Sequence, residues 1–154
     1  MKLAYNSKSG YIQVKSNQGQ LIGLKLSGTV YTPPKQTKFK NYVLMVSLDP
    51  ESCEKLDKIY SELNAFYAEE NINQELKPFY ITSSLNVPTY FLYLSKDDLL
   101  KYNLEDPDFV IDVKFNVFFK SYDVSKYHPK LFLHSLTYER SDKGDAEAYQ
   151  IDFI

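Results

Sequence analysis

The chain has 154 residues, of which 44% are hydrophobic and 25% are charged, and its formal net charge is −2. This length and composition predict one soluble globular domain and argue against a mainly disordered chain. No apolar run approaches the ~20 residues that cross a bilayer, and residues 1–6 turn polar without a signal-peptide core, so we expect a cytoplasmic protein with no membrane partner.

The first 48 residues predict three β-strands, at 11–15, 21–31 and 39–48. The polar cluster SNQG at 16–19 and the pair Pro33 and Pro34 are typical turn signals between these segments. Both alternating sets of side chains are apolar in 39–48. This pattern indicates a central strand, or one packed in a barrel.

A long helix is expected directly after the third of these strands. Asp49 is a favourable N-cap, and Pro50 suits the first helical position. The apolar residues that follow recur with helical spacing and form one stripe. Its members are Leu56, Ile59, Tyr60, Leu63, Phe66 and Tyr67. The other face of this helix carries Glu and Asp residues, which make the middle of the chain acidic.

The second half predicts further strands, at 79–82, 89–94, 109–122 and 131–140. Ser95 and Asp98 have capping-box spacing and predict a short helix after 89–94. Alternation in 109–122 places Lys114 and Phe118 on the outer side of that strand. In the return strand we expect Leu131 and Leu133 on one side, and on the other side Phe132, His134, Leu136 and Tyr138.

Short strands, one central helix and long hairpins predict a mainly β fold over residues 1–141. We expect a β-barrel, with the five-stranded OB-fold as the leading candidate and an α+β sandwich as the alternative. Residues 142–154 form an acidic C-terminal tail in this interpretation.

Charge is segregated along the chain in a way that the net charge hides. Residues 1–48 hold seven lysines and no acidic residue, whereas 49–112 hold 14 acidic residues against five lysines. Residues 113–141 are basic again, and the tail is acidic. Such asymmetry favours a polyanion-binding face opposite a face that keeps the molecule soluble.

Aromatic residues are interleaved with lysines in two segments, 35–42 and 114–130. A single-stranded nucleic acid needs this mixture, because cations follow its backbone while rings stack on its bases. The alternative is that the rings are core or rim hydrophobes and the lysines only aid solubility. The candidate DNA-binding residues are Lys35, Lys38, Lys40, Lys114, Lys120, Lys126 and Lys130 at the phosphates and Tyr31, Phe39, Tyr42, Phe118, Tyr122 and Tyr127 as stacking rings.

The tail combines acidic residues with a hydrophobic tip. Its candidate partner-binding residues are Asp142, Asp145, Glu147, Asp152 and Phe153. A flexible segment of this kind can compete with nucleic acid for a basic face and dock on partner proteins. Alternatively, the alternating Tyr149, Ile151 and Phe153 form a last strand or a dimer contact.

Signals for catalysis are weak, and we expect a protein that is not an enzyme. Cys53 is the only cysteine, so no internal disulfide is possible. A first helical turn can lower a thiol pKa, but a structural or incidental thiol is the interpretation we favour for Cys53. Asp97 with Asp98 fits a helix cap, and Asp106 with Asp108 fits a turn, better than Mg²⁺ ligands. We expect no catalytic residue, no metal and no cofactor.

The order of these features resembles the bacteriophage single-stranded DNA-binding proteins with an OB fold. Residues 28–34 (GTVYTPP) look like that family's early strand running into a Tyr-Pro turn, and 39–50 with the following helix look like its strand-then-helix step. Residues 113–122 with 131–136 are similar to its closing hairpin, and the acidic tail with Phe153 is similar to its partner-binding tail.

The resemblance implies binding to single-stranded DNA without sequence preference and without catalysis, in phage DNA replication or recombination. It also implies the host-cell cytoplasm as the location and replication or recombination proteins as partners of the tail. Two other classes remain: a non-enzymatic protein–protein interaction module, such as a phage structural or host-takeover protein, and a small Mg²⁺-dependent nuclease. A homo-oligomer is compatible with each.

Overall fold

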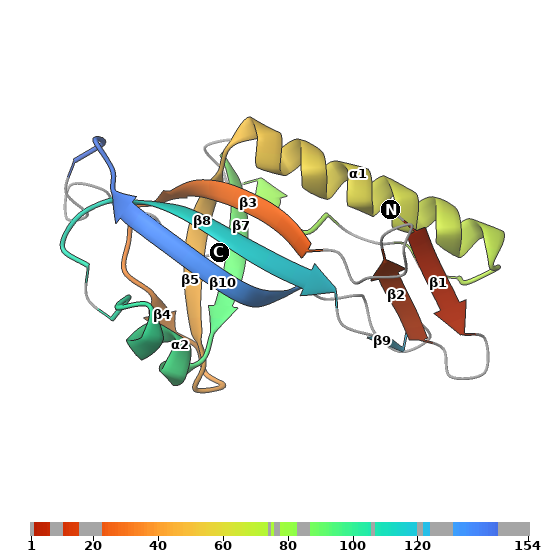
Figure 1. The fold of residues 1–154 in the computed structure, drawn as a ribbon, viewed down its shortest axis with the longest axis horizontal. Helices are drawn as coiled ribbons and strands as arrows, with labels where there is room; N and C mark the ends of the chain where they lie inside the picture. Colours follow the sequence, from red (N-terminus) through yellow and green to blue (C-terminus); the bar gives the residue numbers. More distant parts are fainter. Residues whose placement is uncertain are drawn as a thin grey trace.

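The computed structural model describes residues 2–6, 11–15, 23–73, 75, 78–82, 87–105, 107–119, 122–123 and 131–144. Over these residues the protein is mainly β, with an open seven-stranded antiparallel sheet, a three-stranded sheet and two helices (Figure 1). The mainly β class predicted from the sequence is therefore confirmed.

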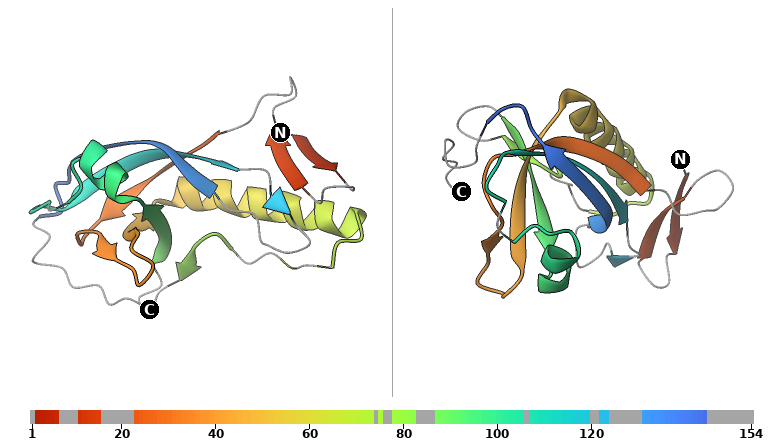
Figure 2. Two further views of the ribbon diagram at one scale, coloured as in Figure 1. Left: turned by 90° about the horizontal axis from the view of Figure 1, so that it is seen from below. Right: turned by 60° about the vertical axis from the view of Figure 1, so that its left-hand side comes forward.

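The seven-stranded sheet curves strongly, as the two views of Figure 2 show. Its strands lie in the order β10 (Leu131–Arg140), β8 (Ile111–Phe119), β3 (Gly23–Val30), β5 (Tyr42–Leu48), β7 (Pro88–Leu94) and β6 (Ile81–Thr82), and β4 (Lys35–Gln36) pairs with β5. A closed barrel would also join β10 to β7. The described residues form no ladder between these two strands, so the sheet is open there.

The three-stranded sheet consists of β1 (Lys2–Asn6), β2 (Tyr11–Lys15) and β9 (Tyr122–Asp123). Figures 1 and 2 place it at the end of the molecule where the C-terminal half of the long helix lies. The strand at 11–15 was predicted, whereas β1 was not. β9 lies in a segment that we expected to be a connecting loop.

The long helix α1 (Pro50–Glu69) begins where the sequence predicted it. The Asp49 carboxylate accepts a hydrogen bond of 2.8 Å from the Ser52 backbone N–H and caps the helix. The predicted stripe is buried at Leu56, Ile59, Leu63 and Tyr67. The predicted capping box is also present, because Ser95 caps α2 (Lys96–Lys101) and Asp98 accepts from the Ser95 N–H.

The core fills the inner side of the sheet and is closed by the first turns of α1 and by α2. It includes Leu26, Leu44, Val46, Leu56, Leu92, Leu99, Val113, Phe115, Val117 and Leu136. The prediction of a central strand is confirmed for β5, because Val43 to Val46 are all buried. That strand begins later than expected, at Tyr42, and Phe39 lies in the turn before it.

The prediction for the two sides of β10 was wrong after His134. Leu133 pairs with Val117 and Ser135 with Asn116, so His134 is an extra residue in a β-bulge. A bulge shifts the alternation by one. Leu136 and Tyr138 therefore pair with Phe115 and Val113 on the core side, together with Leu131 and Leu133, and not with Phe132 and His134.

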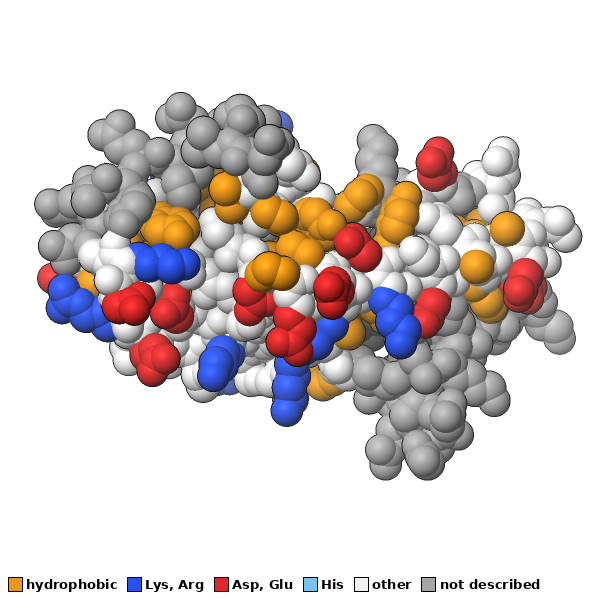
Figure 3. All heavy atoms as spheres, turned by 90° about the horizontal axis from the view of Figure 1, so that it is seen from above, with side chains coloured by type: hydrophobic (Ala, Val, Ile, Leu, Met, Phe, Trp, Pro, Cys, Tyr) orange, Lys and Arg blue, Asp and Glu red, His pale blue; other side chains and the backbone are white. Residues whose placement is uncertain are grey.

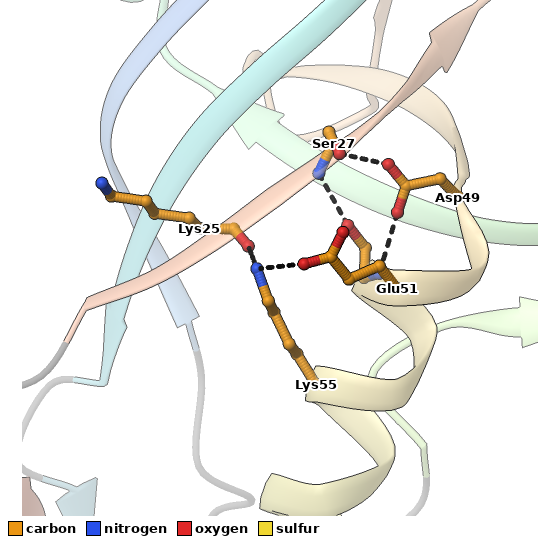
Figure 4. Close-up of polar contacts among 6 residues, drawn as sticks. Lys25, Ser27, Asp49, Glu51 and Lys55 are labelled. Carbon is orange, nitrogen blue, oxygen red and sulfur yellow. Dashed lines mark hydrogen bonds and ion pairs between the residues drawn. The ribbon is translucent and has the colours of Figure 1, made fainter.

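The start of α1 covers a free edge of β3. Strand β3 pairs with β5 only at Gly28 and Thr29, which leaves the backbone before them without a strand on that side. The Ser27 N–H donates to Ser52 Oγ at 2.7 Å, and the Lys25 carbonyl accepts from Lys55 Nζ at 2.9 Å (Figure 4). The Ser27 carbonyl accepts from the Asp49 backbone N–H at 3.1 Å. Helix side chains thus replace a missing strand partner.

Candidate nucleic-acid interface

The connection between β3 and β5 presents an aromatic ring among lysines. A tight turn forms where the Thr37 N–H donates to the Asn41 carbonyl at 2.8 Å and Lys40 takes a left-handed φ of 68°. Phe39 at the tip is 78% exposed, and Lys38 Nζ lies 5.3 Å from its ring centroid. An exposed ring next to ammonium groups is the arrangement that stacks on a base and binds a phosphate.

Tyr93 on β7 extends this surface along the sheet. Lys35, Val43 and Tyr93 are direct cross-strand neighbours on β4, β5 and β7, and Tyr93 is 59% exposed. Tyr42, in contrast, packs partly against the core, with Lys96 Nζ 5.7 Å from its ring. We name the exposed group the Phe39 surface; it consists of Lys35, Lys38, Phe39, Lys40 and Tyr93.

A second candidate surface is the outer face of β3, β8 and β10. The register sets its side chains in cross-strand rows. From one end of the face to the other, the four rows are Gly23–Phe118–Phe132, Lys25–Asn116–Ser135, Ser27–Lys114–Thr137 and Thr29–Asp112–Glu139. The face therefore changes from aromatic, through cationic and hydroxyl-bearing, to acidic.

Two hollows open on this face and share Ser27, Lys114 and Thr137. The larger, of about 470 Å³, is lined by Asp49, Asp112 and Glu139 in addition to the shared residues. The smaller, of about 270 Å³, is lined by Lys25, Lys55 and Lys114 together with Asn116, Ser135 and Thr137, and none of its described lining residues is acidic. We name the smaller one the basic hollow.

The charges around the helix start are held in place by hydrogen bonds. The Lys55 ammonium bonds the Lys25 carbonyl and lies 3.7 Å from Glu51, whereas the Lys25 side chain points away from the helix (Figure 4). Burial alone would raise the pKa of Asp49, but hydrogen bonds from Ser27 and Ser52, together with Lys55, lower it overall. Asp49 therefore stays ionised as a cap.

The aromatic end of the outer face is built around Gly23. The Phe118 ring lies against this glycine so closely that a Cβ there would sit 2.7 Å from Phe118 Cε1. The ring centroids of Phe118 and His134 are 4.7 Å apart. Phe132, the cross-strand partner of Phe118, is 37% exposed.

Within the part of the chain that the structure describes, the two predicted lysine–aromatic segments are not brought together. Val30, before the first segment, pairs with Ile111, whereas Gly23 pairs with Phe118 at the opposite end of the same ladder. Lys114 and Phe118 do lie on the outer face, as expected. Other predicted residues lie outside the described residues: Lys120, Lys126, Lys130, Tyr127, Asp145, Glu147, Asp152 and Phe153. Tyr122 is described only as part of β9.

The first residues of the predicted tail contact the domain. The Val110 N–H donates to the Gly144 carbonyl at 3.1 Å, and Lys143 Nζ donates to Thr29 Oγ1 at 3.1 Å. Lys143 Nζ also lies 5.8 Å from the ring centroid of Tyr31, one of the predicted stacking residues. Asp142 is exposed.

The sequence did not single out Lys25, Lys55 or Tyr93. Lys25 and Tyr93 lie on the outer side of predicted strands, so alternation could have found them. Lys55 joins the site only because α1 docks against β3. The alternative of a lowered thiol pKa is contradicted: burial, followed by the charges of Asp57 and Asp49, raises the pKa of Cys53.

The side of the molecule that α1 covers has a different character. Figure 3, which looks down on this side, shows Asp and Glu side chains interspersed with Lys and Arg. No helix of the described residues is long and apolar enough to cross a membrane. Within the same residues, no three His, Cys, Asp or Glu side chains are grouped as metal ligands would be. No protein-family model, curated protein or solved structure matches the chain.

Proposed function

We propose that the protein binds single-stranded DNA without sequence preference, and that it acts in phage DNA replication or recombination. The Phe39 surface carries this proposal: one ring is 78% exposed, another is 59% exposed, and three lysines accompany them. Each base stacked on such a ring contributes about 1–3 kcal/mol, whatever the base, because every base has a π-face. The phage context comes from the sequence resemblance.

The arrangement of the strands supports the same proposal. In chain order, β3, β5, β7, β8 and β10 would be the five strands of an OB barrel, and pairing β10 with β7 would close it. OB-folds bind oligonucleotides on the face of their second and third strands and on the loops after the first and fourth. The corresponding parts here are β5 with β7, residues 31–41, and the stretch of chain between β8 and β10. Lys35, Lys38 and Phe39 fall in 31–41, whereas Lys114 and Phe118 lie on β8 itself.

The rival function is a protein–protein interaction module, and the same exposed rings favour it. Phe39 and Tyr93 could anchor in pockets of a partner protein, because aromatic residues dominate such interfaces. Lysines that flank the rings would then contribute little. The two functions differ in their dependence on salt, since displacement of counterions from phosphates makes DNA binding steeply salt-sensitive.

The deciding experiment is a titration with a labelled ~30-nucleotide poly(dT) and a matching duplex, at low and high salt. We expect binding to the single strand, with log Kd rising by about 0.7 per contacted phosphate for each tenfold increase in salt. Phe39→Ala is expected to weaken binding by about 5- to 100-fold, since a stacked base is lost. Lys38→Gln should weaken it and reduce the salt dependence.

Matched controls are available on other parts of the surface. Ile81→Ala removes an exposed apolar side chain from β6, and Lys58→Gln removes an exposed lysine from α1. Neither should change the affinity. Absence of single-strand binding at low salt would overturn the proposal, and a stable complex with a partner protein would then support the rival.

A further inference from the structure

We propose that the outer face of β3, β8 and β10 is a second contact for the same DNA strand, with a backbone phosphate in the basic hollow and a base against Phe132 and Phe118. The inference rests on the proposed function and adds a site on a different part of the sheet. None of its cationic side chains except Lys114 was expected to bind DNA.

The basic hollow suits an anion because it concentrates positive charge. Lys25 and Lys114 are diagonal neighbours across the β3–β8 ladder, and Lys55 lines the same hollow from α1. The Lys55 ammonium already bonds the Lys25 carbonyl and lies 3.7 Å from Glu51, so the attraction for a phosphate comes mainly from Lys25 and Lys114. The side chains of Asn116, Ser135 and Thr137 supply neutral hydrogen-bond donors around the same space.

The volume and spacing fit one nucleotide unit. The hollow of about 270 Å³ is far larger than a water molecule, which occupies about 30 Å³. The aromatic row lies two residues along the strands from the row of Lys25 and Asn116, or about 7 Å at 3.3 Å per residue. This distance is within the reach of a nucleotide from its phosphate to its own base.

The aromatic row is prepared for stacking. The Phe118 ring packs against the backbone of Gly23 and lies beside the ring of His134. Phe132, its cross-strand partner on β10, is 37% exposed. A base that covers Phe132 would extend this group of rings.

The opposite end of the face limits where the strand can run. Asp112 and Glu139 are cross-strand neighbours, and together with Asp49 they line the larger of the two hollows. Their negative charges repel phosphate. A bound strand would therefore lie over the aromatic and cationic rows and would not extend to the acidic end of β8.

The test compares single variants in the poly(dT) titration. Phe132→Ala should raise the Kd by about 5- to 150-fold, as expected for one lost stacked base, and should leave the salt dependence unchanged. Lys114→Gln should raise the Kd and reduce the slope of log Kd against log salt by about 0.7, as expected for one lost phosphate contact. Lys58→Gln serves as the control that changes neither.

Each outcome decides between the two proposals. Both side chains are partly or fully exposed, so their variants should fold, and circular dichroism checks this. If both variants bind like the wild type while Phe39→Ala binds weakly, the second contact is overturned and the proposed function stands. If the wild type itself does not bind single strands, both are overturned. The second contact is supported if Phe132→Ala weakens DNA binding with an unchanged salt dependence and Lys114→Gln weakens it with a reduced salt dependence.

Discussion

The ammonium group of Lys55 donates a hydrogen bond of 2.9 Å to the backbone carbonyl of Lys25 and so joins the second turn of α1 to the edge of β3. Together with Ser52 and Asp49, it satisfies backbone groups that a neighbouring strand would otherwise pair. The same contact brings Lys55 to the basic hollow. One docking event therefore protects a sheet edge and assembles a charged surface.

Removal of the Ser52 hydroxyl should destabilise the fold. Ser52 is buried and accepts from the Ser27 N–H, so Ser52→Ala leaves that donor without its partner. We expect a loss of about 1–3 kcal/mol in the free energy of unfolding. Urea denaturation measures it, with exposed Ser61→Ala on the same helix as the control. Equal stability of the two variants would contradict the assigned role.

Asp49 should make the protein sensitive to acid. The folded-state pKa of Asp49 is lowered below the ordinary value of 3.8. The stability that its ionised form contributes is therefore fully present above pH 3.8 and is lost as the pH falls through the folded-state pKa. Asp49→Asn can still cap the helix but does not titrate. Denaturation between pH 5 and pH 3 should therefore show a smaller loss of stability in the variant than in the wild type.

Tyr67→Phe should leave the stability unchanged or raise it. Among the described residues, the Tyr67 hydroxyl is buried without a hydrogen-bond partner, and burial raises its pKa to about 12. Deletion of an unsatisfied group can gain up to about 1 kcal/mol. Tyr80→Phe is the matched control, because the Tyr80 hydroxyl donates to Asp57 at 2.7 Å and its loss should destabilise. If Tyr67→Phe lowered the melting temperature more than Tyr80→Phe does, the Tyr67 hydroxyl would not be an unsatisfied group.

The two glycines of β3 should respond differently to alanine. A Cβ at Gly28 would overlap the backbone oxygen of Ser47, so Gly28→Ala must move β3 away from β5 and should cost about 1–3 kcal/mol or more. A Cβ at Gly23 meets only the Phe118 ring, which can rotate away. Gly23→Ala should therefore keep most of the stability. If Phe118 contributes to DNA binding, this variant should bind poly(dT) more weakly.

Glu139→Gln should strengthen DNA binding. Glu139 is exposed at the acidic end of the outer face, next to Asp112 on β8. The substitution removes one negative charge that repels a strand on the neighbouring rows. We expect an affinity about 2- to 5-fold higher at low salt, with a smaller gain at high salt because ions screen the repulsion. Glu62→Gln on α1 is the control.

Local signals predicted the helices well. The cap at Asp49, the proline after it and the apolar stripe lie within a few turns of one another, so the sequence contains most of what defines α1. The same holds for Ser95 and Asp98 at α2. Most strands of the large sheet were also expected, because their apolar patterns are continuous.

Features that depend on distant segments were not predictable in this way. The bulge at His134 comes from pairing with β8, and no pattern within β10 reveals it. The basic hollow requires Lys25, Lys55 and Lys114, which lie on three different elements. Phe39 was identified as a candidate, but its exposure depends on the turn between Thr37 and Asn41.

The position of α1 in the chain also has a consequence for folding kinetics. Strands β5 and β7 are hydrogen-bonded neighbours, yet the whole of α1 separates them in sequence, so that Ser47 pairs with Thr89. Closing so long a loop costs entropy before its contacts form, whereas β8 and β10 are separated by a much shorter stretch. We therefore expect hydrogen-exchange protection during refolding to appear first in β8 and β10, and only later in β7.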